Sequence, residues 1–311
     1  MSLRYNTISF LSDYGRKDEF VGVVHSVIRQ LAPEVRVIDI THDIAQCDVR
    51  AGGLALGRSA QYLAPGVVIG VVDPGVGTPR RAVAIEVDGG QSVLVGPDNG
   101  LLAPAVAVAG GATRAVHLNN PEYHLATAGS LFDGRDVFAP AAAHLCNGVP
   151  ILELGEEIST ASLLPGTLPI PEDTAEGMIV EVLWIDHFGN VQLNADPGEV
   201  AALGAVFEVR AGQHSRTVRR QDAFEELGLG AVGMVIDSYG ALALVCNQAS
   251  AAEELGLNEG DPLTLAPLDT GSQEVAGGGR SGAGGSPNSG AADAEVQSST
   301  PVTLSRSPRE V

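Results

Sequence analysis

The residues with the clearest chemical potential lie in VVDPGVGTPRR, residues 71–81. Asp73 follows a run of β-branched residues, and Arg80 comes seven residues later, after one proline and two glycines. Proline and glycine permit a tight turn directly after a strand, and such a turn would hold the carboxylate and the guanidinium together at the edge of a sheet. This pair could position and polarise one water molecule, or it could be a salt bridge that only holds the turn.

Other polar segments follow further predicted strands and helices. They are FLSDYGRKDEF (10–20), GPDNGLL (96–102), FDGRDVFAP (132–140), IDHFGN (185–190) and DSYGALALVCNQASAAEELGL (237–257). By the order and spacing of these motifs, residues 6–267 resemble the S-adenosylmethionine (SAM) hydroxide adenosyltransferase family, whose relatives include a fluorinase and a chlorinase. The resemblance implies that water or hydroxide attacks the 5′-carbon of SAM and releases adenosine and methionine. SAM would be the substrate, so no cofactor is expected.

The catalytic residues are assigned by this resemblance. In the family an Asp, an Arg and a His activate water, and Asp73 and Arg80 match the first two. Asp133, in LFDGRD, stands where the family has the histidine of TFHGRD. We expect Asp133 to orient the water, because two carboxylates close to one arginine can share protons. The alternatives are that a histidine such as His124 reaches in from elsewhere, or that turnover is poor.

The resemblance also implies a substrate site built from both halves of the chain. In the first half Asp13 would hold the ribose hydroxyls, since both oxygens of a carboxylate accept hydrogen bonds from a cis-diol. Asp18 would bind the methionine portion. The second half would add Asp186 and Asn190 as polar ligands, Phe188 as an apolar wall, Ser238 on the methionine carboxylate and Asn247 on the adenine edge.

Two other functions compete with hydrolysis. Halogenases of this family carry Tyr in place of Asp73, and a carboxylate there would repel a halide. Val76 and Gly134 stand where the fluorinase offers hydroxyl donors, so halide chemistry is disfavoured. The other competitor is a sensor that binds SAM or adenosine without catalysis. Only turnover separates this sensor from a hydrolase.

The elements that must position these residues form two domains. Residues 1–165 alternate short β-branched runs with amphipathic helical patterns, which predicts a Rossmann-like parallel or mixed sheet. Residues 175–267 contain short β-rich runs that predict a smaller β-barrel, after a proline-rich segment at 163–174. Residues 268–311 are rich in Gly, Ser, Ala and Pro and are predicted to be a disordered tail. Asp39 and Asp43, near the second strand's end, are expected to begin turns.

Composition limits the partners. The formal net charge of −20 disfavours nucleic acid and anionic membrane surfaces. No apolar run is long enough for a membrane span, and no secretory signal is recognised, so a cytoplasmic protein is expected. The three cysteines indicate neither a disulfide framework nor a CxxC metal site, and no metal is predicted. The resemblance implies a homotrimer with active sites at the subunit interfaces.

Overall fold

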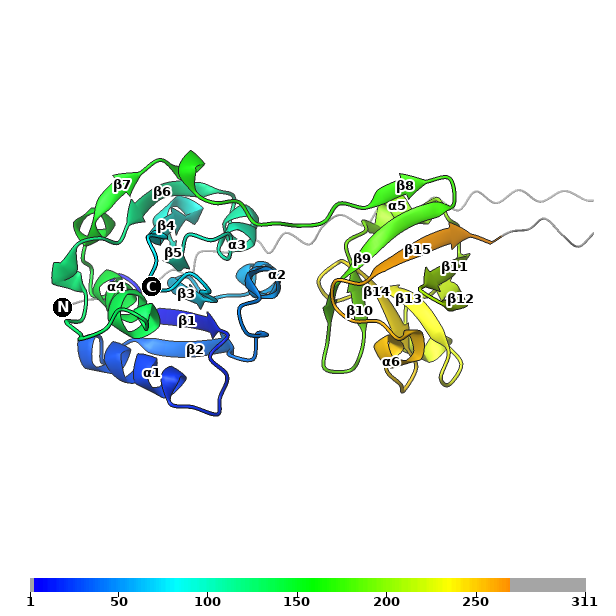
Figure 1. The fold of residues 1–311 in the computed structure, drawn as a ribbon, viewed down its shortest axis with the longest axis horizontal. Coiled ribbons are helices and arrows are strands. Elements are labelled where there is room, and N and C mark those ends of the chain that lie inside the picture. The colour runs from blue at the N-terminus through cyan, green and yellow to red at the C-terminus, as the bar shows by residue number, and fades with distance from the viewer. Residues whose placement is uncertain (1–2, 269–311) are drawn as a thin grey trace, which may run out of the picture. The chain divides into compact units, whose positions relative to one another are not determined.

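The computed structural model describes residues 3–268, which form an α/β domain followed by a β-barrel domain (Figure 1). The predicted fold class is confirmed. The predicted tail lies outside the described residues, apart from Leu268.

The first domain is built on a mixed sheet of seven strands in the order β2-β1-β3-β5-β4-β6-β7. Strands β2, β1, β3 and β5 run parallel, whereas β4, β6 and β7 pair antiparallel with their neighbours. The strands are β1 Thr7–Ser12, β2 Arg36–Thr41, β3 Val67–Val71, β4 Ala82–Val87, β5 Ser92–Pro97, β6 Ala112–His117 and β7 Glu156–Ile158.

Helices cover both faces of this sheet. Helix α1 packs with α4 in one hydrophobic core, and α2 packs with α3 in a second one. Every residue of β1, β3 and β4 is buried, as expected for strands covered on both faces. The helices are α1 Phe20–Leu31, α2 Val49–Ala60, α3 Ala103–Val108 and α4 Ala139–Cys146. The short turns are η1 Asp88–Gly90, η2 Pro121–Tyr123, η3 Gly134–Phe138, η4 Ile151–Leu154 and η5 Thr160–Ser162.

The predicted alternation of strands and helices is therefore confirmed at the start of the chain, where β1, α1, β2, α2 and β3 follow one another and β1 lies between β2 and β3. Asp13 directly follows β1, and Asp73 lies two residues beyond β3. The prediction that Asp39 begins a turn is wrong, because Asp39 lies within β2. Its carboxylate contacts two histidines instead of capping the backbone.

The second domain is a closed barrel. Its strands follow the order β10-β14-β13-β12-β11-β15-β9, and β9 pairs with β10 to close it, while β8 adds to β9 outside the ring. The pairs are antiparallel except β12 with β13. The elements are β8 Glu172–Thr174, β9 Gly177–Ile185, β10 Val191–Leu193, α5 Pro197–Ala201, β11 Val206–Ala211, β12 His214–Arg220, η6 Phe224–Glu226, β13 Val232–Ile236, β14 Leu242–Cys246, α6 Ala251–Leu255 and β15 Pro262–Pro267.

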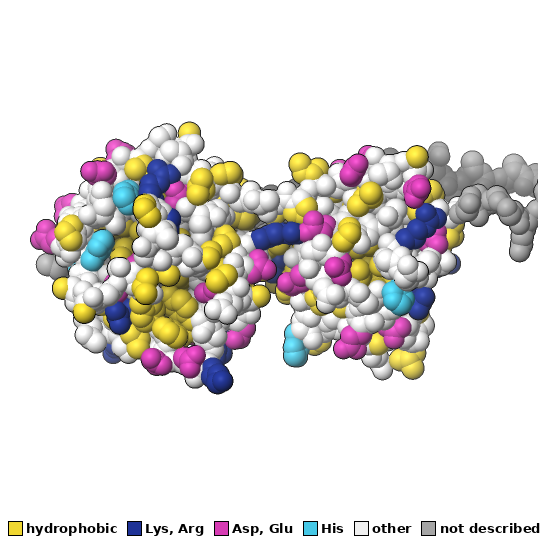
Figure 2. All heavy atoms as spheres, in the orientation of Figure 1, with side chains coloured by type: hydrophobic (Ala, Val, Ile, Leu, Met, Phe, Trp, Pro, Cys, Tyr) yellow, Lys and Arg dark blue, Asp and Glu magenta, His cyan; other side chains and the backbone are white. Residues whose placement is uncertain are grey.

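The face drawn in Figure 2 carries charges of both signs. On the face drawn in Figure 2, Lys and Arg side chains are scattered among Asp and Glu and form no continuous basic surface. Within residues 3–268, none of the helices has both the length and the apolar character that crossing a membrane requires.

Candidate active site

Three of the predicted catalytic residues form one ion-paired cluster. Arg80 Nε donates to Asp73 Oδ1 at 2.9 Å and to Asp73 Oδ2 at 3.0 Å, and Nη2 donates to the same carboxylate. The Nη2 atom also donates to Asp133 Oδ2. The side chains of Asp73, Arg80 and Asp133 are only 6%, 13% and 17% exposed. One guanidinium thus holds two largely buried carboxylates side by side.

The turn between Asp73 and Arg80 explains why they meet. The Val76 N–H donates to the Asp73 carbonyl at 3.2 Å, and the Thr78 N–H donates to the Gly75 carbonyl at 3.1 Å. Gly77 has a φ of +78°, which favours glycine at that position. These bonds fold the chain back, so that Arg80 reaches the carboxylate that follows β3.

Asp133 comes from a different element. It directly precedes the π-helical turn η3, which continues into α4. Phe138, the last residue of η3, is fully buried, and the Arg80 guanidinium carbon lies 5.5 Å from its ring centroid. The aromatic ring of Phe138 is therefore within cation–π range of the guanidinium that the two carboxylates bind.

The pKa of Arg80 shows which effect dominates in this cluster. Burial alone would lower the pKa of Arg80, but hydrogen bonds and charge from Asp73, together with the charge of Asp133, raise it above its ordinary value. Arg80 is therefore a permanent cation here. With both carboxylates ionised, the cluster carries one net negative charge.

Asp13 lies on the loop that follows β1. Its Oδ2 accepts a 2.9 Å hydrogen bond from the Cys47 N–H, and its own N–H donates to the Val71 carbonyl at 3.2 Å. This second bond ties the loop to the end of β3, from which Asp73 follows. Asp13 and Asp73 are thus held beyond the ends of two neighbouring strands.

Tyr14 links these loops and was not singled out from the sequence. Its ring lies 5.7 Å from that of Phe20 and 5.6 Å from that of Phe132, the residue before Asp133. Burial, reinforced by the charges of nearby carboxylates, strongly raises the pKa of Tyr14, which keeps its hydroxyl neutral. A Cβ on Gly134 would lie 2.2 Å from that hydroxyl, so only glycine fits there. The signal available in the sequence was an aromatic residue next to Asp13 (Tyr14) and another next to Asp133 (Phe132).

His124 is brought close to Asp133. Both residues line a hollow of about 460 Å³ together with the segment 125–130. Burial lowers the pKa of His124, although the charge of Asp133 opposes this shift. A neutral imidazole is able to accept a proton. His124 is therefore placed as the alternative with a histidine from elsewhere in the chain requires, close to Asp133.

The barrel gathers a second group of the predicted residues. Asp186, Phe188, Asn190 and Ser238 line a hollow of about 490 Å³, whose remaining wall includes Trp184. Phe188 is 75% exposed and presents its ring as an apolar surface.

Two similar turns shape this hollow. Asp186 Oδ1 accepts from the N–H groups of Phe188 and Asn190, both at 2.9 Å. Asp237 Oδ1 accepts from Tyr239 and Ala241 in the same pattern, at 2.8 and 3.0 Å. The Asp186 carboxylate therefore has its hydrogen-bond partners within its own turn. Its predicted contact with substrate stays a prediction.

Asp18 and Asn247 are not brought into either group. Asp18 is exposed. Asn247 Nδ2 donates to the Leu227 carbonyl at 2.7 Å, and Asn247 does not line the barrel hollow. Their roles toward substrate stay predictions.

Comparison with known proteins identifies the family. Residues 8–155 match the SAM hydroxide adenosyltransferase N-terminal domain, and residues 180–264 match the C-terminal domain of the same family. The chain belongs to the SAM hydroxide adenosyltransferase family. Together the matched segments span both domains of the fold.

Named relatives within this family carry two activities. The chain is 42% identical over 260 residues to an (R)-S-adenosyl-L-methionine hydrolase from Salinispora arenicola (strain CNS-205), covering 83% of this chain and 97% of that protein. It is 25% identical over 288 residues to a fluorinase from Actinoplanes sp. (strain N902-109), covering 83% and 96%. A structure of an uncharacterized conserved protein from Thermotoga maritima is similar with a TM-score of 0.76 at 32% identity, covering 83% of this chain and 99% of that one.

Proposed function

We propose that this protein is a SAM hydrolase that forms adenosine. The oxygen of water forms a bond to C5′ of SAM, the C5′–S bond breaks, and its electron pair stays on sulfur. The products are adenosine, methionine and one proton. The observation that carries the proposal is the clamp in which Arg80 holds Asp73 and Asp133 together. The hydrolase named among the relatives supports it.

The clamp suits this reaction because little activation is required. The sulfonium of SAM leaves as a neutral thioether, so catalysis depends mainly on aligning water with C5′ and excluding bulk solvent. Asp73, bound through both oxygens by Arg80, fixes one side of the water. Asp133 shares only one oxygen with Arg80, so its other oxygen can accept the proton that the water loses.

Negative charge also favours water over halide. Two carboxylates and one guanidinium leave a net charge that attracts the sulfonium and repels an anion. The structure has valine at position 76, and Gly134 is packed against the Tyr14 hydroxyl, so neither supplies a hydroxyl group for a halide.

The remaining roles follow the same proposal. Asp13 holds the ribose diol and Asp18 the methionine end. The barrel residues Asp186, Phe188, Asn190, Ser238 and Asn247 contact adenine and methionine. We propose a homotrimer in which the sheet domain of one subunit meets the barrel of its neighbour, and size-exclusion chromatography with light scattering tests that assembly. The three free cysteines favour the reducing cytoplasm as its location.

The deciding experiment is chromatography of the products after incubation with SAM. In chloride-free buffer, and again with added fluoride or chloride, we expect adenosine and methionine in equal amounts. A 5′-halo-adenosine would contradict the proposed role of Asp73. Tight binding of SAM without any product would instead support a non-catalytic sensor.

A further inference from the structure

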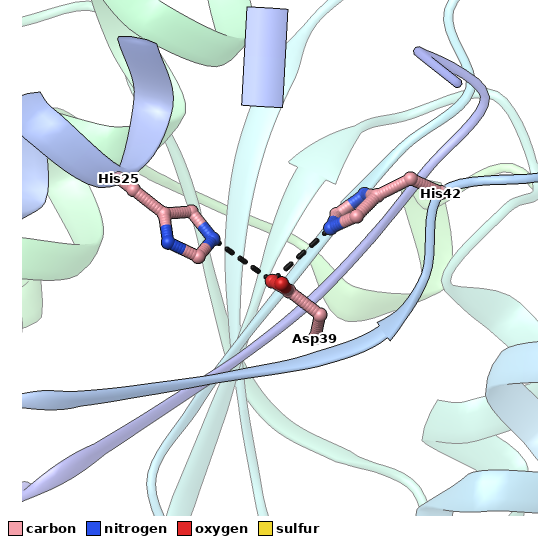
Figure 3. A group of neighbouring side chains, drawn as sticks. All are labelled: His25, Asp39 and His42. Atoms are coloured by element: carbon pink, nitrogen blue, oxygen red, sulfur yellow. Dashed lines mark hydrogen bonds and ion pairs between the residues drawn. The ribbon is translucent and has the colours of Figure 1, made fainter. Parts of the chain in front are cut away.

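A group of three metal-ligating side chains lies apart from the residues assigned to catalysis. His25 comes from α1, Asp39 from β2 and His42 from the loop after β2 (Figure 3). His25 Nε2 lies 2.8 Å from Asp39 Oδ1, and His42 Nε2 lies 3.1 Å from the same oxygen. The candidate ligand atoms all lie within 4.8 Å of one another. Figure 3 shows both imidazole rings turned with their Nε2 atoms toward Asp39.

His42 supplies an independent observation that favours a ligand. Its side chain is only 1% exposed, yet its Nε2 has no hydrogen-bond partner of suitable geometry among the described residues. The approach of Asp39 is close enough for an ion pair but is not aligned as a hydrogen bond. A buried ring nitrogen without an aligned partner is costly, and a coordinated cation would remove that cost.

The other nitrogen of His42 is already fixed. His42 Nδ1 shares a 2.8 Å hydrogen bond with Ser12 Oγ, and this hydroxyl oxygen is buried at the end of β1. Histidines that bind metals are commonly oriented by such a bond at the nitrogen that faces away from the ion. The ring of Phe10 packs against both histidines, with centroid distances of 4.6 Å to His42 and 6.2 Å to His25. This packing limits the positions of both rings.

We propose that His25, Asp39 and His42 bind one divalent transition-metal ion of the zinc type. Two imidazoles and a carboxylate suit such an ion, which takes nitrogen and oxygen ligands at about 2.0–2.2 Å. Tetrahedral bonds of that length separate the ligand atoms by about 3.3 Å, close to the two separations that Asp39 makes here. His25 and Asp39 are 36% and 30% exposed, so the ion can enter from solvent and keep a water as its fourth ligand.

The ion would act on the fold and take no part in the chemistry. It would join α1 to β2 and to the loop that carries His42. The His42 carbonyl accepts a 2.7 Å hydrogen bond from the Gly15 N–H. Ser12 and Gly15 flank the loop that carries Asp13. Zinc binding should therefore stabilise this corner of the sheet domain, whether or not the protein hydrolyses SAM.

Titration calorimetry with zinc chloride on the full chain tests the site. We expect one equivalent to bind, with the affinity falling at least about 10-fold in His25→Gln and in Asp39→Asn. His214→Gln is the matched control, because His214 is an exposed histidine on β12. Its zinc affinity should equal that of the wild type. Cobalt should give visible absorption bands that both ligand variants weaken.

Thermal unfolding separates loss of the site from loss of the fold. Without metal, His25→Gln should unfold at the wild-type temperature, since His25 is partly exposed. With zinc, the unfolding temperature should rise in the wild type and in His214→Gln but not in His25→Gln. Absence of zinc binding to the wild type, or equal affinity in His25→Gln, would overturn the proposal.

Discussion

The two domains use aspartate in opposite ways. In the sheet domain, Asp73 directs both of its oxygens to the side chain of Arg80. In the barrel, Asp186 and Asp237 each direct Oδ1 to backbone N–H groups of their own turns. The first arrangement fixes the position of the Arg80 guanidinium, and the second fixes the backbone conformation of a turn. Substitutions in the sheet-domain cluster should therefore change turnover most, whereas substitutions in the barrel turns should change stability most.

Arg80 gives the largest expected effect. Arg80→Lys keeps the cation but loses the two-pronged contact with Asp73, and we expect kcat for SAM to fall about 10²–10³-fold with little change in KM.

Arg81→Lys is the control for this variant. Arg81 forms an ion pair with the buried Asp98 but contacts none of the proposed catalytic residues. Steady-state kinetics should show that the kcat of Arg81→Lys lies within about 3-fold of the wild-type kcat, because the substitution is remote from the proposed catalytic residues. An unchanged kcat in Arg80→Lys would mean that the clamp does not act in turnover.

The proton acceptor can be assigned by a second pair of variants. Asp133→Asn preserves the size of the side chain but cannot accept the proton, so kcat should fall about 10²-fold. His124→Gln should reduce kcat much less, because we assign the proton to Asp133. The reverse order of the two rates would move the general base to His124.

Substitution of Asp13 should weaken the binding of adenosine more than it slows turnover. Asp13→Ala removes the charged acceptor to which the ribose hydroxyls donate, a contact worth about 1.5–3 kcal/mol, so affinity for adenosine should fall roughly 10- to 150-fold. Calorimetry with adenosine measures this loss. Asp43→Ala removes an exposed carboxylate near Arg16 and should bind adenosine as the wild type does. Unchanged affinity in Asp13→Ala would overturn the ribose assignment.

The barrel turns should show the opposite pattern. Asp237→Ala removes two backbone hydrogen bonds and the 2.6 Å bond from Gln192 Nε2, so urea unfolding should show a loss of about 1–3 kcal/mol. Asp222→Ala, at an exposed position near the same hollow, should lose much less. Equal stability of Asp237→Ala and the wild type would remove the contrast between the domains.

The smallest expected effect is a pH dependence of stability. Burial lowers the pKa of both His124 and His144 from 6.5, so the unfolded chain binds protons more readily than the folded one. Stability is then highest above the unfolded value and falls as pH drops from about 7 toward 5. Thermal unfolding should show this fall, and His144→Gln should reduce it. An identical pH profile in the variant would contradict the role of His144.

Much of this fold and site could be predicted from the sequence. The strands that precede Asp13 and Asp73 were recognisable because buried parallel strands are continuous apolar runs. Strand β12, His214–Arg220, was missed because HSRTVRR is polar and basic, and its place in the barrel depends on pairing with β11 and β13.

Contacts between distant segments were the hardest to predict. The packing of Tyr14 against Gly134 and the grouping of His25 with Asp39 and His42 each depend on tertiary structure. No sequence pattern indicates that His25 on α1 lies next to Asp39 on β2, so no metal site was predicted from the sequence. The meeting of Arg80 with Asp133 was predicted only through family resemblance, since 53 residues separate them.

The central claim is that the clamp of Asp73, Arg80 and Asp133 delivers water to C5′. The most direct test is to incubate the protein with SAM in water enriched in ¹⁸O and to analyse the adenosine by mass spectrometry. We expect one ¹⁸O atom in the 5′-hydroxyl group, and a much slower appearance of labelled adenosine with Asp73→Asn. Adenosine without ¹⁸O, or labelled adenosine formed equally fast by Asp73→Asn, would contradict this claim.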